Sequence, residues 1–113
     1  MPRARLVLAL LAAGSSPAWA QDLSAPDLFV RADKGYCIAC HQVPEGAGPP
    51  TQADLGPRLE GSRMRELGRA KLRQILVDPM IANPDTVMPP FGRHHILEPR
   101  EIERLVDYLH ALP

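Results

Sequence analysis

The sequence is poor in the large apolar residues that fill a protein core. Its 113 residues include two Phe, two Tyr and one Trp, whereas 13 prolines interrupt the chain. A chain of this length forms one domain at most, and so small a domain is marginally stable on its own side chains. A buried apolar group other than a side chain would supply the missing volume.

The sequence has neither an excess of charge of one sign nor an apolar segment long enough to span a membrane. Basic and acidic residues number 13 each, so the charge balance does not favour nucleic acid or an anionic membrane as a partner. The apolar run 6–13 is too short to cross a bilayer. It follows Arg3 and Arg5 and precedes the small-x-small sequence Ala18-Trp19-Ala20, which is the order of a secretory signal peptide.

We therefore expect residues 1–20 to be a signal peptide and residues 21–113 to be the mature domain, located in the bacterial periplasm. The mature part has eleven basic and thirteen acidic residues, and no membrane span is expected after cleavage. An uncleaved N-terminal anchor is the alternative. The residue directly after the cleavage site is Gln21 and not a cysteine, which argues against a lipid-anchored lipoprotein.

Capping residues and turn signals predict helices joined by long loops. Ser24 can cap a helix that has Asp27 in its first turn and that ends or bends near Gly35. Glycine and proline crowd the segments 44–61 and 79–92, which we expect to be loops. No stretch alternates convincingly as a strand would, so the predicted fold class is all-α, with three or four helices.

Two further helices are expected. One ends at Val77 and begins at Arg63 or Arg69, because Gly68 leaves its start open. The last begins at Pro99, since proline is favoured in the first turn of a helix. Its apolar residues recur with the period of one buried helix face: Ile102, Leu105, Val106 and Leu109.

The two cysteines lie in the sequence CIACH at 37–41, which has the C-x-x-C-H pattern of covalent haem attachment. About one helical turn separates Cys37 from Cys40, so each thiol can bond to one vinyl group along the same edge of the ring. His41 then lies under the iron and donates an imidazole nitrogen. The prediction is one haem c held through Cys37 and Cys40, with His41 as an iron ligand.

Three other interpretations of the cysteine pair are open. A zinc site would need more ligands, and no further cysteine is present. A C-x-x-C disulfide closes a very small loop and stabilises little. A thioredoxin-like redox pair would need a βαβ surround, which the predicted helices do not provide.

The sixth iron position has several candidate ligands. Met88 is favoured, because the prolines in MPPFG at 88–92 would hold its thioether in place while Phe91 packs on the haem. Met80, which follows Pro79, is the second choice. A histidine ligand or an open site also remains possible. The other residues weighed are Met64, His94, His95 and His110.

With these residues in place, the chain resembles the SoxX family, the monohaem cytochrome subunits of thiosulfate-oxidising SoxAX complexes. The similarity runs through the segments GYCIACH (35–41), LGPRL (55–59), LRQILVDP (72–79) and NPDTVMPPFG (83–92). The last segment is far more specific than C-x-x-C-H, which indicates only a c-type haem.

The resemblance implies a class I cytochrome c fold and a heterodimer with a SoxA cytochrome. In such a complex the L-cysteine S-thiosulfotransferase activity belongs to SoxA, whose haem has a cysteine ligand that takes part in joining thiosulfate to the carrier protein SoxY. The SoxX subunit accepts the released electrons and passes them to a small cytochrome c. No catalytic residue is therefore expected in this chain.

The resemblance also assigns two residues around the haem. Class I cytochromes place their distal methionine before the last helix, where Met88 lies. In the same family a proline carbonyl accepts a hydrogen bond from the second ring N–H of the proximal histidine, and here Pro57 would accept it from His41. A plain turn is the alternative for Gly56-Pro57. The alternatives for the whole chain are a free-standing class I electron carrier and a haem sensor with an open iron site.

Overall fold

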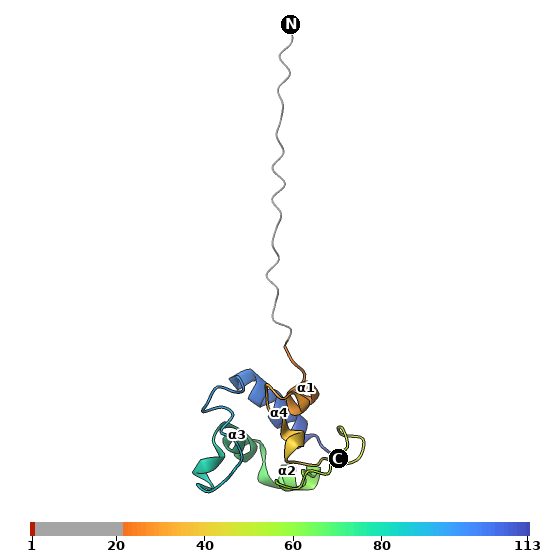
Figure 1. Cartoon of the computed structure of the whole chain (residues 1–113), viewed down its shortest axis with the longest axis vertical. Coiled ribbons are helices and arrows are strands. Elements are labelled where there is room, and N and C mark those ends of the chain that lie inside the picture. The colour runs from red at the N-terminus through yellow and green to blue at the C-terminus, as the bar shows by residue number, and fades with distance from the viewer. Residues whose placement is uncertain (2–21) are drawn as a thin grey trace.

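The computed structural model describes residue 1 and residues 22–113. The described part is helical and has no strand, which confirms the predicted all-α class. The described part has four α-helices and two short 3-10 turns, and Figure 1 labels the α-helices. The elements in chain order are α1 (Ala25–Val30), η1 (Cys37–Ala39), α2 (Gly61–Leu67), α3 (Arg69–Val77), η2 (Pro79–Ile81) and α4 (Pro99–His110).

The predicted start of α1 is confirmed. The Ser24 side chain accepts a hydrogen bond from the Asp27 N–H, and the Asp27 carboxylate accepts one from the Ser24 N–H. This capping box satisfies backbone donors that a helix start leaves free. Leu28 and Phe29 are buried on the inner face. The Gly35 N–H then donates to the Leu28 carbonyl at 3.1 Å, which brings the chain back against α1 just before η1.

The stretch before Val77 contains two helices rather than one. Gly68 separates α2 from α3 with φ +79° and ψ 159°, a conformation that only glycine adopts readily. The sequence left the start of this helix open between Arg63 and Arg69. The structure has α2 beginning at Gly61 and α3 at Arg69.

The last helix is the centre of the core. Glu98 and Glu101 form a capping box at its start. α4 packs against α1, α2 and α3. The predicted apolar stripe is confirmed, since none of its members is more than 6% exposed: Ile102, Leu105, Val106 and Leu109.

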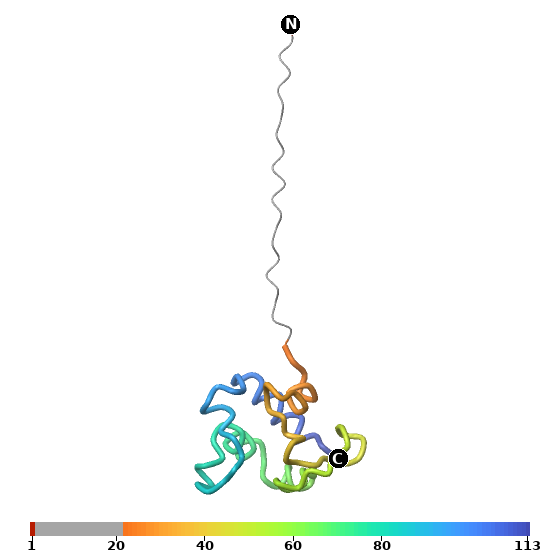
Figure 2. The backbone as a smooth tube through the Cα atoms, in the orientation of Figure 1, coloured from red at the N-terminus to blue at the C-terminus, as the bar shows by residue number. Residues whose placement is uncertain are grey.

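The two long loops lie on opposite sides of the helices. Figure 2 shows the loop before α2 on the right and the loop between η2 and α4 on the left. The second loop is tied to α3 by hydrogen bonds from the Gly92 and Arg93 N–H groups to the Leu76 and Val77 carbonyls, at 3.2 and 2.9 Å. Among the described helices, none is long and apolar enough to cross a bilayer.

Candidate haem site

The C-x-x-C-H motif forms a tight turn at the end of the segment that follows α1. The Cys40 and His41 N–H groups both donate to the Cys37 carbonyl, at 3.1 and 2.8 Å. The turn is a 3-10 helix, where the sequence predicted a helical turn without specifying its type. Both thiols are free and half-buried, so they are not joined in a disulfide.

The His41 ring is held by the carbonyl of Pro57. Its Nδ1 lies 2.6 Å from the Pro57 oxygen. A carbonyl oxygen only accepts, so Nδ1 carries the proton and donates, while Nε2 keeps its lone pair. This is the arrangement of a metal-binding histidine, in which a bond at one ring nitrogen fixes the tautomer and the orientation of the ring. The tuning of a bound haem by Pro57 stays a prediction.

Gly56 lets the loop approach this ring closely. A Cβ at position 56 would lie 2.4 Å from His41 Cε1 and 2.7 Å from His41 Nδ1, where no side chain fits. The Gly56 N–H also donates to the Cys40 carbonyl at 2.9 Å, which ties the loop to the motif itself. From the sequence alone this glycine is only a turn signal, because its steric role depends on where the His41 ring lies.

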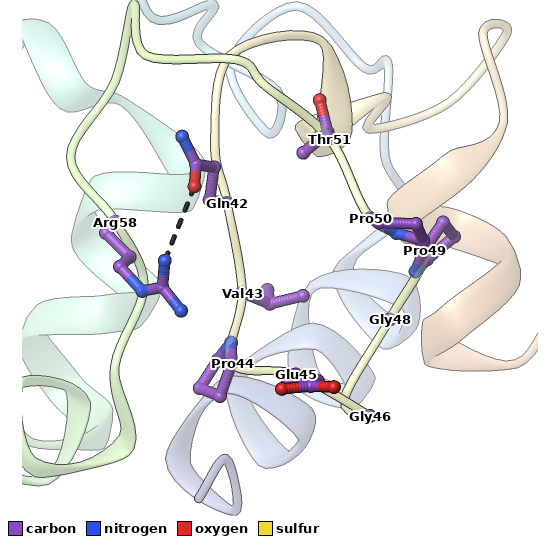
Figure 3. Close-up of a pocket in the computed structure, with 10 residues that line it drawn as sticks. All are labelled: Gln42, Val43, Pro44, Glu45, Gly46, Gly48, Pro49, Pro50, Thr51 and Arg58. Carbon is purple, nitrogen blue, oxygen red and sulfur yellow. Dashed lines mark hydrogen bonds between the residues drawn. The ribbon is translucent and has the colours of Figure 1, made fainter.

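A cavity lies within the loop that begins after His41. It has a volume of about 340 Å³ and opens to solvent. Figure 3 shows the Gln42 side chain and Arg58 facing each other across one part of it, joined by a 3.4 Å hydrogen bond. None of the predicted haem residues lines this cavity. Its lining is Gln42, Val43, Pro44, Glu45, Gly46, Gly48, Pro49, Pro50, Thr51 and Arg58.

Met88 lies in a segment shaped by short polar side chains. The Asp85 N–H donates to Asn83 Oδ1 at 3.2 Å, and the Met88 N–H donates to Thr86 Oγ1 at 3.1 Å. Met88 is partly buried and packs against the core, whereas Met80 is 40% exposed on η2. This difference favours Met88 over Met80 as an inward ligand, and the choice stays a prediction.

The remaining candidates lie outside this arrangement. Phe91 is buried in the core, while His94 and His95 are exposed and His110 is half-buried in the last turn of α4. Within residues 22–113 no three His, Cys, Asp or Glu side chains come together as a metal-binding group, as a zinc site would require.

The environment of Cys37 does not favour a reactive thiol. Burial raises the pKa of the Cys37 thiol to about 12. Such a thiol is protonated at neutral pH and is a poor nucleophile. A thioether to a ring carries no charge and has no such conflict with burial.

The residues present fit a covalent haem. Two free thiols have the C-x-x-C spacing on a short turn. The imidazole that follows them has one nitrogen bonded to Pro57 and the other unused. Met88 supplies a partly buried thioether from the loop before α4.

Comparison with known proteins identifies the family. Residues 21–109 match the family described as "Cytochrome C oxidase, cbb3-type, subunit III". The chain belongs to this cytochrome family. The prediction of a cytochrome c-like fold is therefore confirmed, and a cytochrome c-type domain implies haem.

A solved structure and a curated relative are also similar to this cytochrome. The SoxXA structure from P. pantotrophus has a TM-score of 0.64, with 25% identity and 77% of each chain covered. This likeness confirms the predicted resemblance to SoxX. An "Uncharacterized lipoprotein" of Aquifex aeolicus (strain VF5) is 32% identical over 80 residues, which are 68% of this chain and 36% of the relative. The chain thus spans about a third of that relative's length.

Proposed function

We propose that this cytochrome is a periplasmic electron-transfer protein that acts as the SoxX-type subunit of a SoxAX complex, and that residues 1–20 are its signal peptide. One observation carries the haem assignment. The His41 ring, directly after the two cysteines, is held through Nδ1 by the Pro57 carbonyl and keeps its Nε2 lone pair for iron.

Each predicted residue has a defined task in this proposal. Cys37 and Cys40 would tether the haem, and His41 and Met88 would supply its iron ligands. Phe91, which is buried in the core, would pack against the haem. The haem supplies a one-electron redox couple when bound, and histidine-methionine ligation suits electron transfer at a raised potential. The chain contributes a fixed histidine tautomer and a thioether on a proline-rich segment.

The exposed apolar side chains support a protein partner. Beside the attachment turn lie Tyr36 and Leu55, which are 45% and 72% exposed. The segment before Met88 adds three more: Met80 at 40%, Ile81 at 65% and Val87 at 78%. Contiguous exposed apolar patches commonly mark an interaction site, and we propose that these side chains contribute to one. Because Tyr36 precedes Cys37 and Val87 precedes Met88, a SoxA-type partner bound there would lie close to the residues that would hold the haem.

The proposed division of labour places sulfur chemistry on the partner. Cys37 and Cys40 are the two cysteines of the chain, and both are used in haem attachment. None is then left as a nucleophile or persulfide carrier. SoxA would carry the catalytic haem and act on thiosulfate and SoxY. This subunit would pass the electrons to a small cytochrome c.

Purification from the native host tests the proposal. Intact mass should correspond to residues 21–113 plus one haem that acidified organic solvent does not extract. A SoxA-type cytochrome should co-purify. In stopped-flow measurements the isolated subunit should not turn over thiosulfate, whereas the pair with SoxY should show thiosulfate-dependent haem reduction.

A pair of surface variants locates the partner. Ile81→Glu places a charge in the exposed apolar group and should weaken SoxA binding. Ala70→Glu adds the same charge at an exposed position near the start of α3 and should bind normally. Equal SoxA binding by both variants would show that the exposed apolar side chains near Met88 do not bind the partner.

The family match favours one alternative function. The matched family is described as an oxidase subunit, so a free-standing carrier between respiratory complexes is the second candidate. Failure of every SoxA-type protein to bind, together with rapid electron exchange with a respiratory oxidase, would favour that carrier.

A further inference from the structure

The loop between His41 and Pro57 returns to the residue from which it starts. Gln42 follows His41 directly, and the Pro57 carbonyl at the far end accepts the bond from His41 Nδ1. At the base of the loop, the Leu59 N–H donates a hydrogen bond to the Gln42 carbonyl at 2.8 Å. The loop end that carries the Pro57 carbonyl is thus tied to the motif on both sides of Pro57, by the Gly56 and Leu59 N–H groups, and is continuous with the rest of the loop.

Side-chain hydrogen bonds hold residues 51–53 of this loop but not residues 44–50: Gln42 Nε2 donates to the Ala53 carbonyl at 2.9 Å, and Thr51 Oγ1 donates to the Ile38 carbonyl at 3.2 Å. The cavity of about 340 Å³ occupies the space where packed side chains would otherwise support the 44–50 limb (Figure 3). Within the limb, the Ala47 N–H donates to the Pro44 carbonyl at 3.0 Å and closes one turn. Compact loops are usually packed by their own side chains. Here Ala47 packs against the core, so a hydrogen bond to this residue is well placed to hold the limb.

The Tyr108 hydroxyl provides such support from α4. It donates to the Ala47 carbonyl across 61 positions of sequence. Among the described residues, this is the one hydrogen bond that reaches the 44–50 limb from outside the loop. The tyrosine is itself fixed, because its ring meets Phe29 of α1 edge-on with centroids 5.6 Å apart.

We propose that Tyr108 is a positioning residue for His41: its hydroxyl holds the 44–50 limb, and through it the loop end that carries the Pro57 carbonyl. Loss of the hydroxyl frees the limb to move into the cavity, which opens to solvent. The bond between the Pro57 carbonyl and His41 Nδ1 then opens more often. The inference rests on His41 as the haem ligand in the proposed function.

Solvent exchange of the His41 Nδ1 proton tests this inference. The measurement uses NMR on the reduced holoprotein with labelled histidine. Tyr108→Phe keeps the ring and removes the hydroxyl, and should speed the exchange about two- to tenfold, as expected for losing one ordinary hydrogen bond. The amide protons of Gly56 and Leu59, at the base of the loop, should exchange faster by a similar factor.

A matched control separates positioning from general loosening. Val106→Ala removes two buried methyl groups from the same helix and lowers global stability without touching the hydroxyl. It should leave the His41 exchange near the wild-type rate. Unchanged exchange in Tyr108→Phe, or equal acceleration in both variants, would overturn the proposal.

A second variant displaces the limb on the side that faces Tyr108, whose hydroxyl oxygen would lie 3.5 Å from a Cβ at position 48. A Cβ at position 48 would lie 2.9 Å from Val43 Cγ2, so Gly48→Ala should shift the limb and accelerate exchange while α4 stays intact. If Tyr108→Phe does not fold, the exchange rate of the His41 Nδ1 proton in Gly48→Ala tests the proposal instead, and an unchanged rate would overturn it. Failure of the proposed function is distinguishable, because the wild-type protein would then show no iron-bound histidine signal at all.

Discussion

Replacing Gly56 with alanine should displace the His41 ring from the Pro57 carbonyl. The added Cβ would lie 2.4 Å from His41 Cε1 and 2.7 Å from Nδ1. Carbon atoms in contact are about 3.5–4.0 Å apart, so the ring or the backbone must move by about 1 Å. The backbone is held by the 2.9 Å bond from the Gly56 N–H to the Cys40 carbonyl. We therefore expect the ring to move.

The cost of this movement has two parts. Crowding an already filled contact costs about 1–3 kcal/mol. The displaced ring also loses its hydrogen bond to Pro57, which contributes about 0.5–1.5 kcal/mol. The free energy of unfolding should therefore fall by about 1.5–4.5 kcal/mol in Gly56→Ala.

Gly46→Ala is a matched control for the loss of stability alone, because Gly46 belongs to the 44–50 limb whose movement we expect to affect His41. Gly46 has φ +81° and nothing within 4 Å of an added Cβ, so alanine there suffers backbone strain of about 1–2 kcal/mol without a clash. Urea unfolding of the holoprotein, followed by far-UV circular dichroism, compares the two variants. NMR reports the His41 Nδ1 proton. If Gly56→Ala loses no more stability than Gly46→Ala and keeps the wild-type Nδ1 signal, the reasoning is refuted.

Three further predictions concern the iron ligand, the core and the pH dependence of stability. In the oxidised protein, the charge-transfer band of iron–sulfur ligation should vanish in Met88→Ala and survive in Met80→Ala. The reverse result would mean that Met80, and not Met88, is the iron ligand. Leu105→Ala should lower the free energy of unfolding by about 2–5 kcal/mol, whereas a loss below about 0.5 kcal/mol would mean that the stripe is not packed. Burial raises the pKa of Tyr108, so the folded state binds its proton more tightly. Stability should then fall as pH rises above about 10, the ordinary pKa of a phenol. The urea midpoint of the wild type should decrease as pH rises above this value. In Tyr108→Phe the part of that decrease that is due to the Tyr108 hydroxyl should be absent.

Features that depend on neighbouring residues could be predicted from the sequence. The capping box of Ser24 and Asp27 and the helix that begins at Pro99 follow from residues within one or two turns. The apolar period of α4 identified its buried face for the same reason. Local signals also located the attachment turn, since its chemistry is contained in five consecutive residues.

Contacts between distant segments could not be predicted in this way. Nothing near Tyr108 in the sequence indicates that its hydroxyl reaches Ala47. The role of Gly56 depends on where the His41 ring lies, which the loop between them determines. Gly68 shows the intermediate case, because glycine marks a possible break but the actual φ of +79° is set by how α2 and α3 each pack.

The start of α4 and the segment that leads into the attachment turn form one connected unit. Lys34, three residues before Cys37, forms a 2.8 Å ion pair with the largely buried Glu101 at the start of α4. The Glu101 carboxylate also accepts the Glu98 N–H at 2.8 Å, so a single side chain fixes both the helix start and the segment that leads into the motif. A haem bound through Cys37 and Met88 would join this unit to the loop before α4. In a domain with so few aromatic residues, that junction adds apolar contacts that the side chains alone do not supply, and haem attachment should stabilise the fold as well as carry the electron.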